Sequence, residues 1–495
     1  MPGTTGKCFV RFFPIVVLVL ASTQFHTAEG GAISVLVSEK GLHFTKDVLI
    51  HEALRSILPL RLPQIEKDVK VPVVGMAQII LSDISVDEVK VGSSCVRTGD
   101  RGAMIVLMAS GATANLTMSW RYSYHSWLVP LPISDSGEAA IQVKGMEVGL
   151  NLTLKGQGGS LKLSPVECGC YIKSISVKIS GGSSWLYQGI VSAFQGKIKS
   201  AVEEAIPMKI EEGILRLNSA LQELPKEIPV GDAAEMNVTF IDDPVLNNSS
   251  VYFELDGLFL PENHLPSVIS YRSSHSRVVD SCGDAYKMIE MSLHEDVLNS
   301  ASEVYFREDY LQWIVDKLPD QAMLNTSRWK YIVPQLYLQY PDDNMYLNIS
   351  CSSRPLVKVR KEGITATVDL AVVINVLDAN RSISVACISL VMDVSGSAHI
   401  LLNNLAGTIK LRSLTASLKW SEIGNLHMSF VQTMMSMVIR TIIIPYVNLR
   451  IMKGLPLPLV HGVTLRNARI SYDDLRIVIC SDIAYGNQMT RYLPS

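Results

Sequence analysis

The segment Ser184–Pro225 reads SWLYQGIVSAFQGKIKSAVEEAIPMKIEEGILRLNSALQELP. Its apolar side chains recur every four residues, which predicts a long amphipathic helix with Ser184 as its N-cap. Pro207 removes a helix hydrogen bond, so we expect the helix to break or kink after Ile206. The apolar stripe consists of Leu186, Ile190, Phe194, Ile198 and Val202.

The second half of the chain repeats this pattern in the same order. Another apolar stripe meets an Ile444-Pro445 step, and both long helices run on into a Leu-Pro pair. Each half also begins with a shorter helical segment, Asp47–Leu58 in the first and Glu295–Leu318 in the second. The second stripe consists of Met428, Val431, Met435, Val438 and Ile442. The sequence therefore predicts a repeated architecture with low residue identity between the halves.

Between the helices, apolar residues alternate with polar or small ones over long stretches. A period of two predicts strands with one buried and one solvated face, as in antiparallel sheet. The fold class is therefore α+β, with two twisted antiparallel sheets wrapped on long kinked helices. The clearest alternating stretches are Ala114–Trp120, Met146–Leu154, Ile175–Ile179, Ile364–Leu370 and Leu414–Trp420.

Length and composition indicate more than one domain and a large apolar interior. The chain has 495 residues, of which 48% are hydrophobic and 18% charged, and its formal net charge is −3. Nucleic-acid-binding proteins carry a strongly basic face, so this balance argues against that class. Residues 224–246 are rich in Pro, Asp and Asn, so we place a junction there between domains at 31–223 and 247–495.

The N-terminus has the order of a cleaved secretory signal peptide. Lys7 and Arg11 flank an apolar stretch, Phe12–Ala21, and small residues follow it. The stretch is too short to cross about 30 Å of hydrocarbon, which argues against a membrane anchor. We expect residues 1–30 to form the signal, with cleavage between positions 22 and 30.

A secreted, soluble glycoprotein is the expected mature product. The later apolar run Val431–Val447 is interrupted by Arg440 and Pro445 and is interpreted as a buried amphipathic helix. N-glycosylation sequons support export as a set, although each alone is weak evidence. They occur at Asn115, Asn151, Asn237, Asn247, Asn248, Asn325, Asn348 and Asn380.

Cysteine usage fits an oxidising compartment without a disulfide-dense scaffold. Of eight cysteines, Cys8 leaves with the signal, so an odd number remains and at least one stays unpaired. Their connectivity cannot be read from the sequence. The remaining cysteines are Cys95, Cys168, Cys170, Cys282, Cys351, Cys387 and Cys480.

Common catalytic and metal-binding patterns are incomplete or missing. His51-Glu52 and His294-Glu295 begin like a zinc-protease helix, but Arg55 and Leu298 stand where the second histidine is needed. No Gly-x-Ser-x-Gly elbow occurs, and Gly156–Gly159 is a turn between strands rather than a phosphate loop. We therefore expect no enzyme activity, metal or cofactor.

Several strings resemble the lipopolysaccharide-binding / bactericidal permeability-increasing protein family, over essentially the whole mature chain. Gly41-Leu42, a helix and then Leu60–Pro63 resemble the family's first helix and its exit. Cys168-Gly-Cys170, followed by a strand and Trp185-Leu186, resembles the passage into the first long helix. Lys453–Pro458 (KGLPLP) is the most specific match. The many sequons and the compact length look most like the plant members.

The resemblance implies two elongated antiparallel β-barrel domains joined by a central sheet in a boomerang with pseudo-two-fold symmetry. It also implies an apolar pocket in each barrel, near the interface, that holds a phospholipid-like lipid. From the pattern alone, each candidate lining residue is more simply part of an ordinary core. The candidates are Leu49, Leu54, Ile57, Phe194 and Ile198 in the first domain, and Val431, Met435 and Val438 in the second.

The chain departs from the animal members in two respects. Those members bridge the strand before the first long helix to a cysteine within it, and Ser184–Leu224 contains none. In place of that bridge we expect Cys95 to pair with Cys168 or Cys170, and Cys351 with Cys387. Animal members also carry many lysines at the first barrel's tip, where this chain has a modest, mixed patch. Its candidate headgroup contacts, which a solvated turn explains as simply, are Lys67, Lys70, Lys90, Arg97 and Arg101.

We therefore expect an extracellular, monomeric protein that binds bacterial lipopolysaccharide or phospholipid in antibacterial defence, without catalysis. The bacterial outer-membrane surface would be its target, and a cell-surface receptor a further partner. One alternative is a lipid carrier between membranes that uses the same pockets. Another is a structural extracellular glycoprotein whose pockets are filled once, during folding. Exchange of bound lipid distinguishes the structural alternative from the other two.

Overall fold

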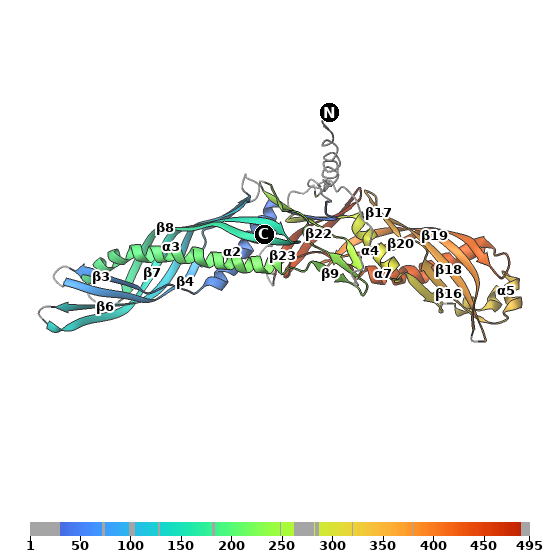
Figure 1. Ribbon diagram of the computed structural model, residues 1–495, viewed down its shortest axis with the longest axis horizontal. Helices are drawn as coiled ribbons and strands as arrows, with labels where there is room; N and C mark the ends of the chain where they lie inside the picture. The colour runs from blue at the N-terminus through green and yellow to red at the C-terminus, as the bar shows by residue number, and fades with distance from the viewer. Residues whose placement is uncertain are drawn as a thin grey trace, which may run out of the picture.

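The computed structural model shows an elongated molecule with a sheet-rich domain on each side of a central sheet. The far ends of both domains drop below the centre, which gives a shallow boomerang (Figure 1). The structure describes residues 30–71, 75–98, 104–126, 129–180, 184–247, 249–261, 282, 287–318, 320–379 and 381–486. Residues 1–29, which hold almost all of the expected signal peptide, lie outside the described part.

The central sheet joins distant parts of the chain. Its first strand, β1 (Ile33–Val37), pairs antiparallel with both β12 (Ser250–Leu255) and β14 (Ile289–His294). The last two strands complete the order β11-β12-β1-β14-β23-β22. The other bounds are β11 (Val245–Asn247), β22 (Val463–Asp473) and β23 (Arg476–Tyr485). The apolar face of this sheet forms a core that contains Ile33, Met291 and Ile479.

The segment assigned to the junction is folded. It contributes β9 (Glu227–Val230) and β10 (Ala234–Asn237), which pair with each other, and β10 also pairs with β13 (Phe259–Pro261). Residues 224–246 therefore contribute strands to a small sheet at the centre of the molecule.

The N-terminal domain is a twisted antiparallel sheet in the order β2-β4-β6-β7-β8, with β3 on β4 and β5 on β6. Alternation predicted its strands correctly, because Ala114, Leu116 and Trp120 are all buried on its inner face. The strands are β2 (Leu60–Arg61), β3 (Ile65–Val71), β4 (Gly75–Lys90), β5 (Ser93–Thr98), β6 (Met104–Ser126), β7 (Val129–Gln157) and β8 (Ser160–Ser180).

Helix α3 (Ser184–Gln222) lies along β8 and also contacts β3, so it stands between the two margins of the sheet. Among the described strands the sheet does not close on itself, and the helix completes the enclosure. α3 runs through Pro207 as one helix of 39 residues, so the helix does not end at the Ile206-Pro207 step. Val202 and Ala205 before the proline and Ile214 after it are buried, and this packing holds the helix together where one hydrogen bond is lost.

The C-terminal domain repeats this plan. Its sheet has the order β15-β16-β18-β19-β20-β21, with β17 on β18. The strands are β15 (Gln312–Val315), β16 (Asn344–Cys351), β17 (Leu356–Arg360), β18 (Gly363–Asp378), β19 (Arg381–Leu401), β20 (Asn404–Ser421) and β21 (Leu455–Pro456). The helices are α4 (Glu295–Arg307), α5 (Pro334–Gln339), α6 (Met428–Val438) and α7 (Ile444–Ile451).

One helix prediction in this half needs correction, whereas the expected interruption of the second long helix at the Ile444-Pro445 step is confirmed. The helix expected over Glu295–Leu318 ends at Arg307, because the β-prone residues Gln312–Val315 pair with β16 instead. The second long helix is interrupted by a π-helical turn, Ile439–Ile443, just before Pro445. By length and composition Met428–Ile451 is apolar enough to span a membrane, yet Val431, Met435 and other side chains of it are buried in the domain core, as expected.

Candidate functional site

The candidate pocket residues of the C-terminal domain lie together but are tightly packed. Val431, Met435 and Val438 on α6 are 1–2% exposed. Met435 and Val438 line a cavity of about 20 Å³, and Val431 lines a neighbouring one of about 10 Å³. Each has room for about one water molecule and none for an acyl chain. In this conformation the C-terminal site is a filled core.

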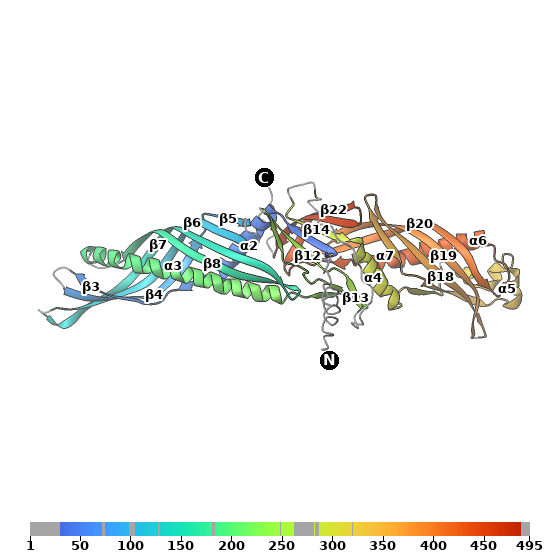
Figure 2. The same cartoon turned by 45° about the horizontal axis from the view of Figure 1, so that its top comes forward.

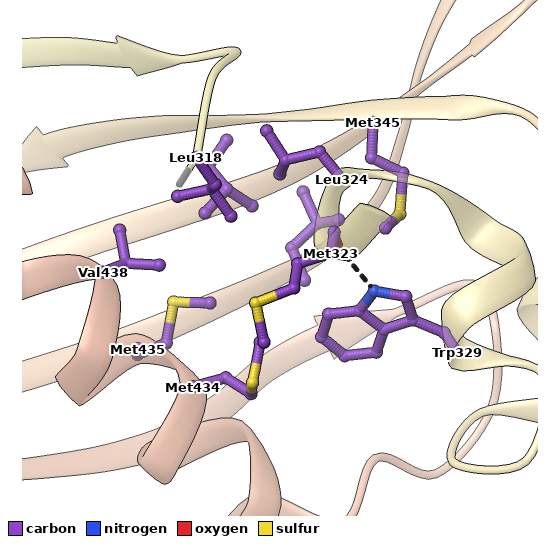
Figure 3. Close-up of a pocket in the computed structure, with 10 residues that line it drawn as sticks. Leu318, Met323, Leu324, Trp329, Met345, Met434, Met435 and Val438 are labelled. Carbon is purple, nitrogen blue, oxygen red and sulfur yellow. Dashed lines mark hydrogen bonds between the residues drawn. The ribbon is translucent and has the colours of Figure 1, made fainter. Parts of the chain in front are cut away.

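Methionines supply four of the ten residues that line the larger of these two cavities. Figure 3 shows Met434 and Met435 from α6 facing Met323 across the cavity, with Met345 farther away beside Leu324. The indole N–H of Trp329 donates to the Met323 carbonyl at 2.9 Å, which fixes one wall. Because methionine has three rotatable bonds and adapts its shape, this lining can change volume more easily than one of branched side chains.

The candidate residues of the N-terminal domain fall into two groups. Phe194 and Ile198 on α3 are 1–2% exposed and belong to the core at the far end of the domain. Leu49, Leu54 and Ile57 lie on α2 (Glu39–Ile57), where Leu49 is 37% exposed and the other two are half-buried. Ile57 packs against the far-end core, whereas Leu49 and Leu54 belong to none of the described hydrophobic clusters, unlike the α6 stripe.

The interior of this domain is correspondingly divided. One buried cluster occupies the far end, and a separate smaller one, around Leu150 and Ile214, lies toward the central sheet. Half-buried apolar side chains of the inner wall, including Ile105, Leu107 and Val148, border these clusters. The inner wall therefore holds apolar surface that the protein itself does not fully cover.

Polar contacts hold α2 beside this wall (Figure 2). Lys46 is 6% exposed, and its Nζ donates to Ser94 Oγ at 2.6 Å on β5 and pairs with Asp47 at 2.7 Å. At the start of the helix, Lys40 and Lys287 both reach the Asp482 carboxylate, at 2.8 and 3.0 Å. Burial raises the pKa of Asp482, but the two lysines outweigh it and hold that pKa below its usual value.

Two cysteine side chains of β8, Cys168 and Cys170, add to the apolar character of the inner wall. Ser94, Ala109, Val148 and Cys170 are aligned across β5–β8 and so share one face. Burial, reinforced by nearby glutamates, raises the pKa of Cys168 to about 11 and that of Cys170 to about 12. Both thiols are therefore neutral near pH 7 and behave as small apolar groups.

The expected disulfides are wrong. The bridge joins Cys282 to Cys480 on β23, with a Cα–Cα distance of 5.9 Å, and Cys95, Cys168, Cys170, Cys351 and Cys387 are free. Cys95 on β5 is separated from the cysteines of β8 by β6 and β7, which is three strand spacings or about 14 Å. β18 likewise lies between Cys351 and Cys387. A disulfide needs Cα atoms within about 7 Å.

The candidate headgroup contacts do not form one patch at the tip. Lys67 and Lys70 lie on β3 near the far end of the domain, whereas Lys90 and Arg97 lie at the other end of β4 and on β5, toward the central sheet (Figure 2). β4 has 16 residues, which separates its ends by roughly 45 Å. Lys90 also pairs with Glu88 at 2.8 Å. Arg101 lies outside the described residues.

Most of the sequons are on accessible positions. Asn115, Asn151 and Asn348 alternate with buried residues on their strands and so face outward. Asn237 is half-buried, Asn247 is exposed, and Asn325 caps a short 3₁₀ helix; Asn248 and Asn380 lie outside the described residues. Glycosylation at these positions stays a prediction.

The two histidine motifs have local structural roles. Glu52 pairs with Arg55 at 3.5 Å on the exposed side of α2. His294 is the N-cap of α4, where its side chain accepts from the Asp296 N–H at 3.2 Å. In both cases the contacts are those of a helix N-terminus or surface.

Comparisons with known proteins agree with this architecture. The LBP / BPI / CETP family matches residues 41–224 with its N-terminal domain and residues 231–485 with its C-terminal domain. A putative BPI/LBP family protein of Arabidopsis thaliana is 47% identical, covering 97% of both chains. Human lipopolysaccharide-binding protein is 22% identical over 92% of this chain and 94% of its own. A crystal structure of lipopolysaccharide binding protein superposes with a TM-score of 0.66 at 18% identity, covering 92% of this chain and 99% of that one. The chain belongs to the LBP / BPI / CETP family.

Proposed function

We propose that the protein binds a lipid with acyl chains, bacterial lipopolysaccharide or a phospholipid, outside the cell in defence against bacteria. The observation that carries this is the incompletely covered apolar surface on the inner wall of the N-terminal domain, where Ile105, Leu107 and Val148 are only half-buried. Relatives named for lipopolysaccharide binding and for bactericidal permeability increase support the choice of ligand.

The mechanism is burial of hydrocarbon. Acyl chains lie against α2 and the inner wall near Leu107 and Val148, where each methylene removed from water contributes about 0.8 kcal/mol before ordering costs. Lys67 and Lys70 point to opposite faces of β3, so we expect at most one of them to contact a lipid phosphate, through a charge-assisted hydrogen bond. The filled C-terminal core predicts one occupied lipid site per chain, not two, unless its methionines rearrange.

Two adjacent residues of β6 give a matched test. Leu107 is half-buried on the inner face, and Met108 is 50% exposed on the outer face. Leu107→Gln should weaken binding of a fluorescent phospholipid to the delipidated protein by about tenfold or more, because it places an amide against the acyl chains. Met108→Gln should leave binding unchanged. Equal affinities for both variants would rule out the inner wall as the site.

Native mass spectrometry of the secreted protein identifies the ligand class. A phospholipid or lipopolysaccharide that exchanges with added lipid supports the proposal. A lipid that never exchanges would favour a structural glycoprotein, and a folded protein without lipid that also takes up none would overturn lipid binding.

A further inference from the structure

The far end of the C-terminal domain contains an open hollow that the lipid site does not use. It lies where the end of α5, the start of β19 and the end of β20 meet, with α5 at the extreme end of the molecule in Figure 1. Its volume is about 640 Å³, within the range of small-molecule sites. The lining residues are Gln339, Tyr340, Ile383, Ser384, Trp420 and Glu422.

Trp420 lines this hollow and is partly exposed to solvent. Trp120 and Trp329 are 3% and 8% exposed, and their indole N–H groups donate to backbone carbonyls. Trp420 is 38% exposed and lines the hollow together with Tyr340. Aromatic rings left partly in water offer flat apolar faces together with a polar edge, which suits a ligand with both C–H and hydroxyl groups.

The polar lining favours an uncharged, hydroxyl-rich ligand. The Gln339 amide can donate and accept, and Ser384 Oγ donates to Asn375 Oδ1 at 2.8 Å, which leaves its lone pairs to accept. Glu422 is the one charged lining residue, and its carboxylate repels phosphate groups. Phospholipid headgroups and other anions are therefore poor fits.

The walls of the hollow are fixed against each other. The Glu422 N–H donates to the Val385 carbonyl at 2.9 Å, and Ser421 Oγ donates to the Gly424 carbonyl at 2.7 Å. Gly424 has φ +82° and packs so closely on Gln335 of α5 that a Cβ there would collide with its amide. A preformed site of this kind loses little entropy when it binds a ligand.

We propose that this hollow binds a neutral saccharide, with a pyranose ring stacked on Trp420 and Tyr340 and its hydroxyls bonded to Gln339, Ser384 and Glu422. Such a sugar could belong to a bacterial glycolipid or to an N-linked glycan. The site is separate from the acyl-chain surface of the N-terminal domain and does not depend on it.

Calorimetric titration of the full-length secreted protein tests the proposal. The probes are a neutral O-antigen oligosaccharide released from bacterial lipopolysaccharide and N-glycans released from a plant glycoprotein, each tried before and after removal of the protein's own N-glycans. Binding of the first identifies a bacterial source, and binding of the second a glycan source. Binding only after deglycosylation identifies the chain's own glycan as the occupant. The probes carry no acyl chains, so the lipid proposal is untouched by the result.

Variants assign the binding to the hollow. Trp420→Ala should lower affinity about tenfold or more, and Trp420→Phe by much less, because phenylalanine keeps a stacking face. Tyr331→Ala is the control, since Tyr331 is 85% exposed but does not line the hollow. The proposal is overturned if neither probe binds in any state, or if Trp420→Ala, shown to be folded by circular dichroism, binds as tightly as the unaltered protein.

Discussion

The two domains hold their long helices in the same way but fill their interiors differently. In the N-terminal domain, side chains of α3 bond the backbone of the edge strand β8: Gln195 to the Ile175 carbonyl, Glu203 to the Ile172 N–H and Asn218 to the Leu163 N–H. In the C-terminal domain, Gln432 accepts from the Ala416 N–H of β20, and Asn448 both accepts from and donates to Ile409.

This device satisfies backbone groups that would otherwise be unpaired at a sheet margin. The interiors of the two domains differ. In the C-terminal domain, methionines and other apolar side chains leave only small cavities in the core. In the N-terminal domain, apolar side chains of the inner wall stay half-buried. The shared plan therefore fixes where the helix lies, and individual side chains decide whether space remains for a ligand.

The largest expected difference between the two domains appears when one apolar side chain in each of them is shortened. Met435→Ala should lower the free energy of unfolding by about 2–5 kcal/mol, since it leaves a cavity in a packed core. Leu49→Ala should cost less than about 1 kcal/mol in the lipid-free protein, because Leu49 is 37% exposed. Urea unfolding measures both. Similar losses would mean that α2 is packed as firmly as α6.

The hydrogen bonds from the long helices to the edge strands can be compared between the two domains by replacing one asparagine in each. Asn448→Ala should cost about 1–3 kcal/mol, because it leaves both the N–H and the carbonyl of Ile409 without that partner. Asn218→Ala removes one bond, to the Leu163 N–H, and should cost about 0.5–1.5 kcal/mol. The same unfolding measurements apply, and a reversed order would show that the helix is held by packing alone.

The smallest effect concerns the anchoring of α2. The pKa of Asp482 is held below its unfolded value of about 3.9, so its ionised form stabilises the fold above that pH, and the contribution is lost as pH falls through the lower folded value. Asp482→Asn should therefore cost about 0.5–1 kcal/mol at pH 7 and progressively less below pH of about 4. A difference between the two proteins that does not change with pH would argue against the lysine–aspartate contact as its source.

The sequence predicts local structure well and long-range pairing poorly. Alternation identified the long strands because the burial of Ala114 or Leu116 depends only on which face of a strand it occupies. The helix predicted to Leu318 failed because β15 is formed through its pairing with β16, a partner the local pattern cannot reveal. The disulfide failed for the same reason, since Cys282 and Cys480 are 198 residues apart.

For the candidate site residues, too, the sequence predicts local features well and long-range contacts poorly. The α6 stripe was correctly grouped, but whether Met435 borders a pocket or fills it depends on Met345 from a distant strand, at a cavity of about 20 Å³. The basic candidates were grouped by sequence nearness, and the length of β4 separates them. Trp420 was noted only as a strand residue, because its exposure depends on how α5 and the following loop pack around it.

The position of β1 has a consequence for how the protein is made. β14, which pairs with this first strand, has β23 as its other neighbour, and β23 is synthesised much later than both. The central sheet therefore keeps an open margin until β23 has emerged from the ribosome, and pairing over such sequence separations is slow. Formation of the Cys282–Cys480 bridge, which needs β23, would mark the moment when this margin is closed.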